Sequence, residues 1–100
     1  MRTQTQGHTL TVSDFTELST TNGPQTRDYI RQSLTDAHTT LELDLSQVRF
    51  LDSHGISVLI SLHKTMCQRG GKVRLLHPQP PVSQLLELLS FSTVFEIVRS

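Results

Sequence analysis

Residues 41–56, LELDLSQVRFLDSHGI, constrain the fold more than any other part of this chain. Leucines at positions 41, 43 and 45 alternate with acidic residues at 42 and 44, which is typical of a strand with one buried face and one wet face. Residues 52–55 contain no apolar side chain, and after them the apolar residues recur with a helical period. The stretch therefore predicts a strand followed by a helix. Ser53 should be exposed in the first helical turn, where backbone N–H groups lack partners and negative charge is favoured.

The rest of the chain extends this pattern into an α/β fold. Breaker clusters rich in Asn, Gly and Pro separate the periodic segments, and Gly70-Gly71 is a typical left-handed helix end. The expected elements are strands at 8–13 and 15–18, a helix from Pro24 to about Ala37, a strand at 41–45, a helix at 53–69, a strand at 72–76, a helix at 82–89 and a strand at 94–98.

The strand–helix–strand unit at 41–76 indicates how the sheet is covered. If its two strands are parallel neighbours, their leucines and valines share one face. Glu42, Asp44, Lys72 and Arg74 share the other, where opposite charges on adjacent strands attract. A face with four charged residues is not covered by helices. We therefore expect a small mixed β-sheet with helices packed on one face.

Composition limits the organisation of the chain and its classes of partner. One hundred residues suffice for one domain, and we expect a flexible N-terminus at residues 1–7 and a single domain at 8–100. Nine basic and nine acidic residues give zero net charge with no basic cluster, which argues against nucleic-acid binding. The single cysteine, Cys67, suits a reducing compartment, and no segment reaches membrane-spanning length. We expect a cytoplasmic protein without direct membrane insertion.

The helix at 53–69 has an apolar side and a polar side. Its apolar arc predicts core packing and contains Ile56, Val58, Leu59, Ile60, Leu62, Met66 and Cys67. The opposite side is flat and carries short side chains, namely Ser53, Ser57, Ser61, Lys64 and Gln68. The sequence leaves two interpretations of this polar side open, a solvated surface and a docking surface for a partner.

Residues 52–54 resemble a catalytic triad only in their letters, because consecutive side chains on a helix point in different directions. Helix capping explains either Asp52 or Ser53, and it requires only one of them. Gly70-Gly71-Lys72 lacks the spacing of a phosphate-binding loop, and the five histidines lack metal-ligand spacing. The sequence therefore predicts no catalytic residues, no metal and no cofactor.

The chain resembles the bacterial STAS domain, specifically the anti-sigma factor antagonist family, over about residues 8–98. The shared pattern is most specific at 44–55 and 69–76. It consists of Asp-Leu-Ser at a strand end, Phe-Leu-Asp-Ser-x-Gly at 50–55, a long helix ending in Gly-Gly, a strand and a Leu-rich terminal helix. Relatives often carry a second serine at the position of His54, and an aspartate at the position of Ser19. The family's fold agrees with the sheet expected above.

The resemblance implies a switch between partners. In the family, a serine kinase of the histidine-kinase ATPase fold, which is also the anti-sigma factor, phosphorylates the serine that here is Ser53. The unphosphorylated antagonist binds this kinase and frees the sigma factor, phosphorylation releases the antagonist, and a PP2C-type phosphatase resets it. The resemblance and the polar helix side together give the expected partner-binding residues, which are Ser19, Asp52, Ser53, His54, Gly55, Ser57, Ser61 and Lys64.

Two alternatives come from other functional classes. The first is a cytoplasmic subunit of a membrane transport system, in which a STAS module binds the ATPase subunit without phosphorylation. The second is a small hydrolase that uses Ser53 and His54, which would require a deep pocket beside Ser53. We expect the non-enzymatic, phosphorylation-regulated interaction domain.

Overall fold

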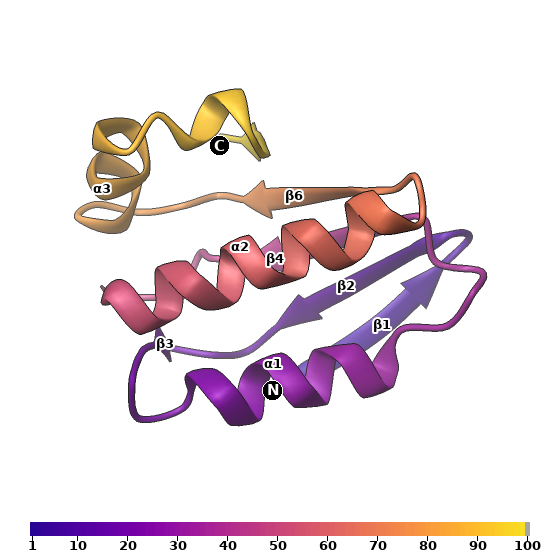
Figure 1. Cartoon of the computed structure of the whole chain (residues 1–100). Helices are drawn as coiled ribbons and strands as arrows, with labels where there is room; N and C mark the ends of the chain where they lie inside the picture. Colours follow the sequence, from indigo (N-terminus) through magenta and orange to yellow (C-terminus); the bar gives the residue numbers. More distant parts are fainter. Residues whose placement is uncertain (100) are drawn as a thin grey trace.

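The computed structural model describes residues 1–99 and contains an open five-stranded sheet with helices over one face (Figure 1). The strand order is β1-β2-β4-β6-β7, and β3 and β5 form a separate two-stranded sheet. In chain order the elements are β1 (Arg2–Gln6), β2 (Thr9–Ser13), β3 (Glu17–Leu18), α1 (Gly23–Ser33), β4 (Thr40–Asp44), β5 (Phe50–Leu51), α2 (Ser53–Gln68), β6 (Lys72–Leu76), α3 (Val82–Leu88), a 3₁₀ turn (Phe91–Thr93) and β7 (Glu96–Val98).

The sheet is mixed, as predicted. Strand β1 pairs antiparallel with β2, whereas β2–β4, β4–β6 and β6–β7 are parallel pairs. The predicted parallel neighbours at 41–45 and 72–76 are β4 and β6, in a register that places Leu41 beside Val73 and Leu43 beside Leu75. Helix α2 connects these two strands.

The two faces of the sheet differ as the alternation predicted. The leucines of β4 are at most 1% exposed and belong to a core that α1 and α2 cover side by side (Figure 1). On the other face, Arg74 donates hydrogen bonds from Nη1 to Glu42 at 3.2 Å and from Nε to Glu96 at 2.6 Å. These partly exposed ion pairs leave this face polar and open.

Within the predicted N-terminal segment 1–7, Arg2–Gln6 form strand β1, which the sequence analysis did not expect. Strand β1 lies at the sheet edge, and four of its five side chains are exposed, so it has no apolar alternation to detect. Strand β1 is held by backbone pairing with β2, and the two strands are joined by a tight turn in which Gly7 has a φ of 62°. Glycine adopts this conformation at little cost, which suits a two-residue hairpin turn.

The helix predicted to reach about Ala37 ends at Ser33. Leu34 turns to extended backbone, with φ −75° and ψ 136°, and packs against the core. The loop that follows is held by His38, whose Nδ1 accepts a hydrogen bond from the backbone N–H of Thr35 at 3.0 Å. Tertiary burial of Leu34 and His38 therefore ends the helix one turn early.

Two further boundaries differ from the expected ones. Strand β5, at Phe50–Leu51, lies between the expected strand at 41–45 and the expected helix at 53–69, and its short pairing with β3 has no signal in the sequence. The last strand begins at Glu96 rather than at residue 94, because the 3₁₀ turn before it places Phe95 in the core at 2% exposure.

Candidate functional site

Asp52 fixes the start of α2. Its backbone is extended, and its Oδ1 accepts hydrogen bonds from the N–H groups of His54 and Gly55, both at 3.0 Å. Its Oδ2 accepts from the backbone N–H and the hydroxyl of Thr20, also at 3.0 Å. These bonds, led by the Thr20 and Gly55 N–H groups, lower the pKa of Asp52 to about 2. The carboxylate is therefore an ionised cap that joins α2 to the loop after β3.

Thr20 is a site residue that the sequence analysis missed. Its single hydroxyl hydrogen is donated to Asp52, so its oxygen is an acceptor toward His54 Nδ1 at 2.9 Å. His54 must then carry a hydrogen on Nδ1. In the sequence, Thr20 belongs to a Ser-Thr-Thr-Asn run, and this pattern predicts only a turn.

Ser53 is the first residue of α2 and is exposed, as predicted. Its carbonyl oxygen accepts a hydrogen bond from the Ser57 hydroxyl at 3.0 Å. Its own hydroxyl has no hydrogen-bond partner among residues 1–99. Because the Asp52 side chain supplies the cap, the start of α2 does not use the Ser53 hydroxyl as a hydrogen-bonding group within residues 1–99.

Gly55 is buried and serves packing rather than surface contact. A Cβ atom at this position would lie 1.9 Å from the carbonyl oxygen of Leu18 and 2.7 Å from a methyl carbon of Leu51. Only glycine lets α2 approach β3 and β5 this closely. Gly55 therefore fixes the position of Ser53 and presents no surface of its own to solvent.

Two of the predicted partner-binding residues, Ser19 and Ser61, are not fully exposed. Ser19 is 1% exposed, and its hydroxyl donates to Glu17 at 2.7 Å inside the loop that precedes α1. Ser61 is half-buried and accepts a hydrogen bond from Arg31 of α1. These contacts hold the loop and the two helices together.

The exposed stripe of α2 includes an apolar residue. Ser53, Ser57, Ile60 and Lys64 are exposed and fall within one narrow sector at 100° per residue. Ile60 is 38% exposed, and Cys67 is also exposed, so the prediction that both lie in the core is wrong. We call Ser53, Ser57, Ile60 and Lys64 the α2 stripe.

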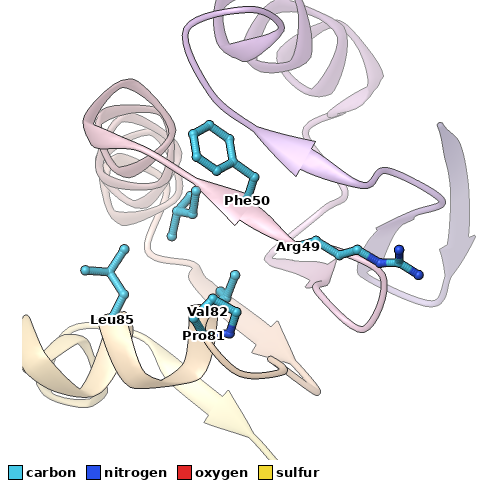
Figure 2. Close-up of a pocket in the computed structure, with 6 residues that line it drawn as sticks. Arg49, Phe50, Pro81, Val82 and Leu85 are labelled. Atoms are coloured by element: carbon cyan, nitrogen blue, oxygen red, sulfur yellow. The ribbon is translucent and has the colours of Figure 1, made fainter.

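The geometry does not support a hydrolytic triad. Both Asp52 oxygens are occupied, and His54 Nδ1 contacts Thr20 rather than Ser53. A groove of about 260 Å³ lies between β5 and α3, where Leu85 faces the strand that carries Phe50 (Figure 2). Ser53 does not line this groove.

Within residues 1–99, no group of three or more His, Cys, Asp or Glu side chains is placed to hold a metal ion. None of the helices in this range is long and apolar enough to cross a membrane.

The chain is similar in sequence or in fold to proteins named as anti-sigma factor antagonists. It is 34% identical over 56 residues to an anti-sigma F factor antagonist from Paenibacillus polymyxa, a match that covers 56% of this chain and 45% of that relative. Its fold is similar to a Thermotoga maritima protein proposed to be an anti-sigma factor antagonist (TM-score 0.91, 19% identity, covering 99% of this chain and 86% of that one). It is also similar to the phosphorylated form of the Bacillus cell fate determinant SpoIIAA (TM-score 0.75, 19% identity, 99% and 91%). The STAS domain profile matches residues 1–100, and the chain belongs to the STAS domain family.

Proposed function

We propose that this chain is an anti-sigma factor antagonist that switches partners when Ser53 is phosphorylated. The unphosphorylated protein binds a cytoplasmic serine kinase/anti-sigma factor of the histidine-kinase ATPase fold. Phosphorylation ends that binding, a PP2C-type phosphatase restores it, and the chain itself catalyses nothing. The observation that carries the proposal is the exposed hydroxyl of Ser53, which has no hydrogen-bond partner within residues 1–99, at a helix start that Asp52 already caps.

The hydrogen bonds favour Ser53 over its neighbours as the phosphoacceptor. Thr20 is also exposed, but its hydroxyl is donated to Asp52 and accepts from His54. The Ser57 hydroxyl is donated to the Ser53 carbonyl. Modification of Thr20 or Ser57 would break these bonds, whereas modification of Ser53 breaks none. The match of the fold to a phosphorylated SpoIIAA is consistent with this choice.

The α2 stripe explains how phosphate would expel the partner. A partner seated on Ser53 and Ser57 would cover exposed Ile60 and gain apolar contact. Phosphate adds about −1.5 to −2 charges at pH 7. Burying that charge with no opposite charge or hydrogen-bond donor beside it costs several times more free energy than a typical hydrogen bond gains. Binding should therefore collapse after phosphorylation.

The fold itself should tolerate the phosphate. At an exposed helix N-terminus an anion is favoured by roughly 0.3–1 kcal/mol, and repulsion from ionised Asp52 opposes this with a similar magnitude. We expect only a small change in melting temperature on phosphorylation. A loss of several degrees or more would show that Ser53 is structurally enclosed.

The test is calorimetry against the serine kinase encoded nearest to this gene, with and without ATP. We expect Ser53→Ala to bind the kinase constitutively and Ser53→Asp to bind it at least about tenfold more weakly. Ser57→Ala is the matched control and should still be phosphorylated. Equal affinity for the Ala and Asp variants would eliminate the switch and leave a constitutive role, such as a transport-system subunit.

A further inference from the structure

One edge of the five-stranded sheet is open to further strand pairing. Strand β1 ends the strand order, and in Figure 1 no described helix or strand lies beyond it. It has five residues, no proline and one charged side chain. Edge strands are usually protected by being short or by carrying charges or proline. The opposite edge strand, β7, has three residues, and its Glu96 pairs with Lys72 and Arg74. Of the two edges, β1 is therefore the long and weakly charged one.

The β1–β2 hairpin fixes which backbone groups face outward. Its two-residue turn makes Gln6 and Thr9 the closing pair, and the residues of such a pair exchange both of their hydrogen bonds. Alternation along the strand then directs the N–H and C=O groups of Gln4 toward β2, and those of Thr3 and Thr5 away from it. Each of these two threonines therefore offers one donor and one acceptor at the open edge.

The sequence of β1 is self-complementary in an antiparallel pair. Residues 3–5, Thr-Gln-Thr, read the same in both directions. A second copy of β1 centred on Gln4 places Thr3 opposite the second copy's Thr5, and Thr5 opposite its Thr3. These are the residues whose backbone groups face outward, so each threonine pair can exchange two hydrogen bonds. Arg2 lies opposite the uncharged Gln6, so no like charges meet.

The flank of α1 on this side of the molecule carries an exposed aromatic ring. Ile30 is buried in the core, and Arg31 donates a hydrogen bond to Ser61 of α2. At 100° per residue, Tyr29 and Arg31 lie on opposite sides of Ile30, so Tyr29 is on the flank of α1 away from α2. Helix α1 lies on the β1 side of the sheet (Figure 1). Tyr29 is 43% exposed, and tyrosine is enriched in protein interfaces.

We propose that β1 is a self-association edge, at which two copies of this chain pair antiparallel about a twofold axis through Gln4. The two sheets become one continuous sheet, with the α1 flank and Tyr29 of each copy on the same side of the seam. The chain has zero net charge, so overall charge repulsion does not oppose the contact. A twofold contact uses the same patch on both copies and closes as a dimer. The α2 stripe lies outside the seam, so the pairing is independent of the switch at Ser53.

The first test is sedimentation velocity of the full chain over a concentration series into the millimolar range, with amide hydrogen exchange measured by NMR on the same samples. We expect the sedimenting mass to rise toward that of a dimer. Exchange at the outward amides of Thr3 and Thr5 should slow at least about tenfold, whereas the amide of Gln4, which already faces β2, should change little. A protein that stays monomeric throughout, or unchanged exchange at Thr3 and Thr5, would overturn the proposal.

Charges at Gln4 test the twofold register. Gln4 is exposed, so Gln4→Lys and Gln4→Glu should leave the monomer folded. Each places like charges opposite each other in a dimer and should weaken self-association at least about threefold. An equal mixture of the two should restore it, because opposite charges then meet. The same substitutions at Gln84, which is exposed on α3, are the control and should have no effect. A mixture that fails to restore association, or an equal loss for the Gln84 variants, would contradict the register.

Thr3→Pro tests the backbone hydrogen bonds across the seam. It removes an outward N–H from each copy without removing a bond to β2, and proline is tolerated at such positions of edge strands. We expect the dimer dissociation constant to rise at least about tenfold, while the melting temperature of the dilute protein changes little. An unchanged dissociation constant would count against the seam. If Thr3→Pro does not fold, the mixture of the two Gln4 variants decides the matter.

Discussion

Helix α2 begins at Ser53, whose hydroxyl makes no hydrogen bond within residues 1–99, and ends at a turn that contacts the α1–β4 loop. At its start, Asp52 supplies the cap from outside the helix and leaves the Ser53 side chain unbonded within residues 1–99. At its end, the N–H groups of Gly70 and Gly71 return to helix carbonyls, and the Arg69 side chain donates to the α1–β4 loop. The same helix therefore exposes a side-chain hydroxyl at one end and uses the other end to hold the fold together.

The contrast shows what a modifiable residue requires of its surroundings. Phosphorylation at a helix end is tolerated when another residue meets the local hydrogen-bonding needs. Asp52 does so at the start of α2, together with Thr20. At the other end, a new charge would fall among carbonyl groups and Arg69 contacts that the fold already uses.

The largest expected effect is that of Gly55→Ala at the start of α2. The new Cβ would lie 1.9 Å from the Leu18 carbonyl oxygen, so α2 must shift away from β3. We expect a loss of about 3 kcal/mol or more in unfolding free energy, measured by urea denaturation. Gly70→Ala at the other end meets nothing within 4 Å but has a φ of 72°, and should cost about 1–2 kcal/mol. A larger loss of unfolding free energy for Gly70→Ala than for Gly55→Ala would contradict the prediction that the close packing of α2 against β3 is the stronger constraint.

The next effect concerns the cap. Asp52→Ala removes an acceptor for two N–H groups of α2 and for Thr20, so both the helix start and the loop after β3 should loosen. We expect the melting temperature at pH 7 to fall by roughly 5 °C. Ser61→Ala, which removes only an acceptor of Arg31, is the comparison and should fall less. Equal losses would mean that Asp52 is not the principal cap.

The same carboxylate should give the start of α2 an acid dependence. The pKa of Asp52 is lowered from 3.8 to about 2 in the folded protein, so the cap stabilises the fold fully above pH 4. This contribution is lost as the pH falls from about 4 to 2. The difference in melting temperature between the unaltered protein and Asp52→Asn should therefore shrink over this range. A constant difference down to pH 2 would contradict the prediction.

The smallest expected effect is that of Ser53→Ala on stability. Its hydroxyl makes no hydrogen bond within residues 1–99, so the unfolding free energy should change by less than about 0.5 kcal/mol. The urea midpoint at pH 7 measures this directly. A loss of unfolding free energy above about 1 kcal/mol would mean that the Ser53 side chain stabilises the fold. The start of α2 would then no longer differ from its end in this respect.

Much of the region around Ser53 could be predicted because its pattern is local. Alternation over 41–45, a polar break and a helical period place Ser53 in the first turn of α2, and Asp52 was recognisable as a cap. Thr20 could not be found this way. It lies 32 residues before Asp52, and only the pairing of β3 with β5 brings the two together.

The sequence alone determined the parallel β4–α2–β6 unit, the polar open face and the exposed serine, because side-chain periodicity records which face of each element is buried. The tertiary structure decided that residues 2–6 form strand β1, that Ser19 is buried and that Ile60 is exposed. Each of these depends on which element lies alongside. Edge strands are held by backbone pairing, which leaves no apolar pattern, and an apolar residue is exposed wherever no neighbouring element reaches it.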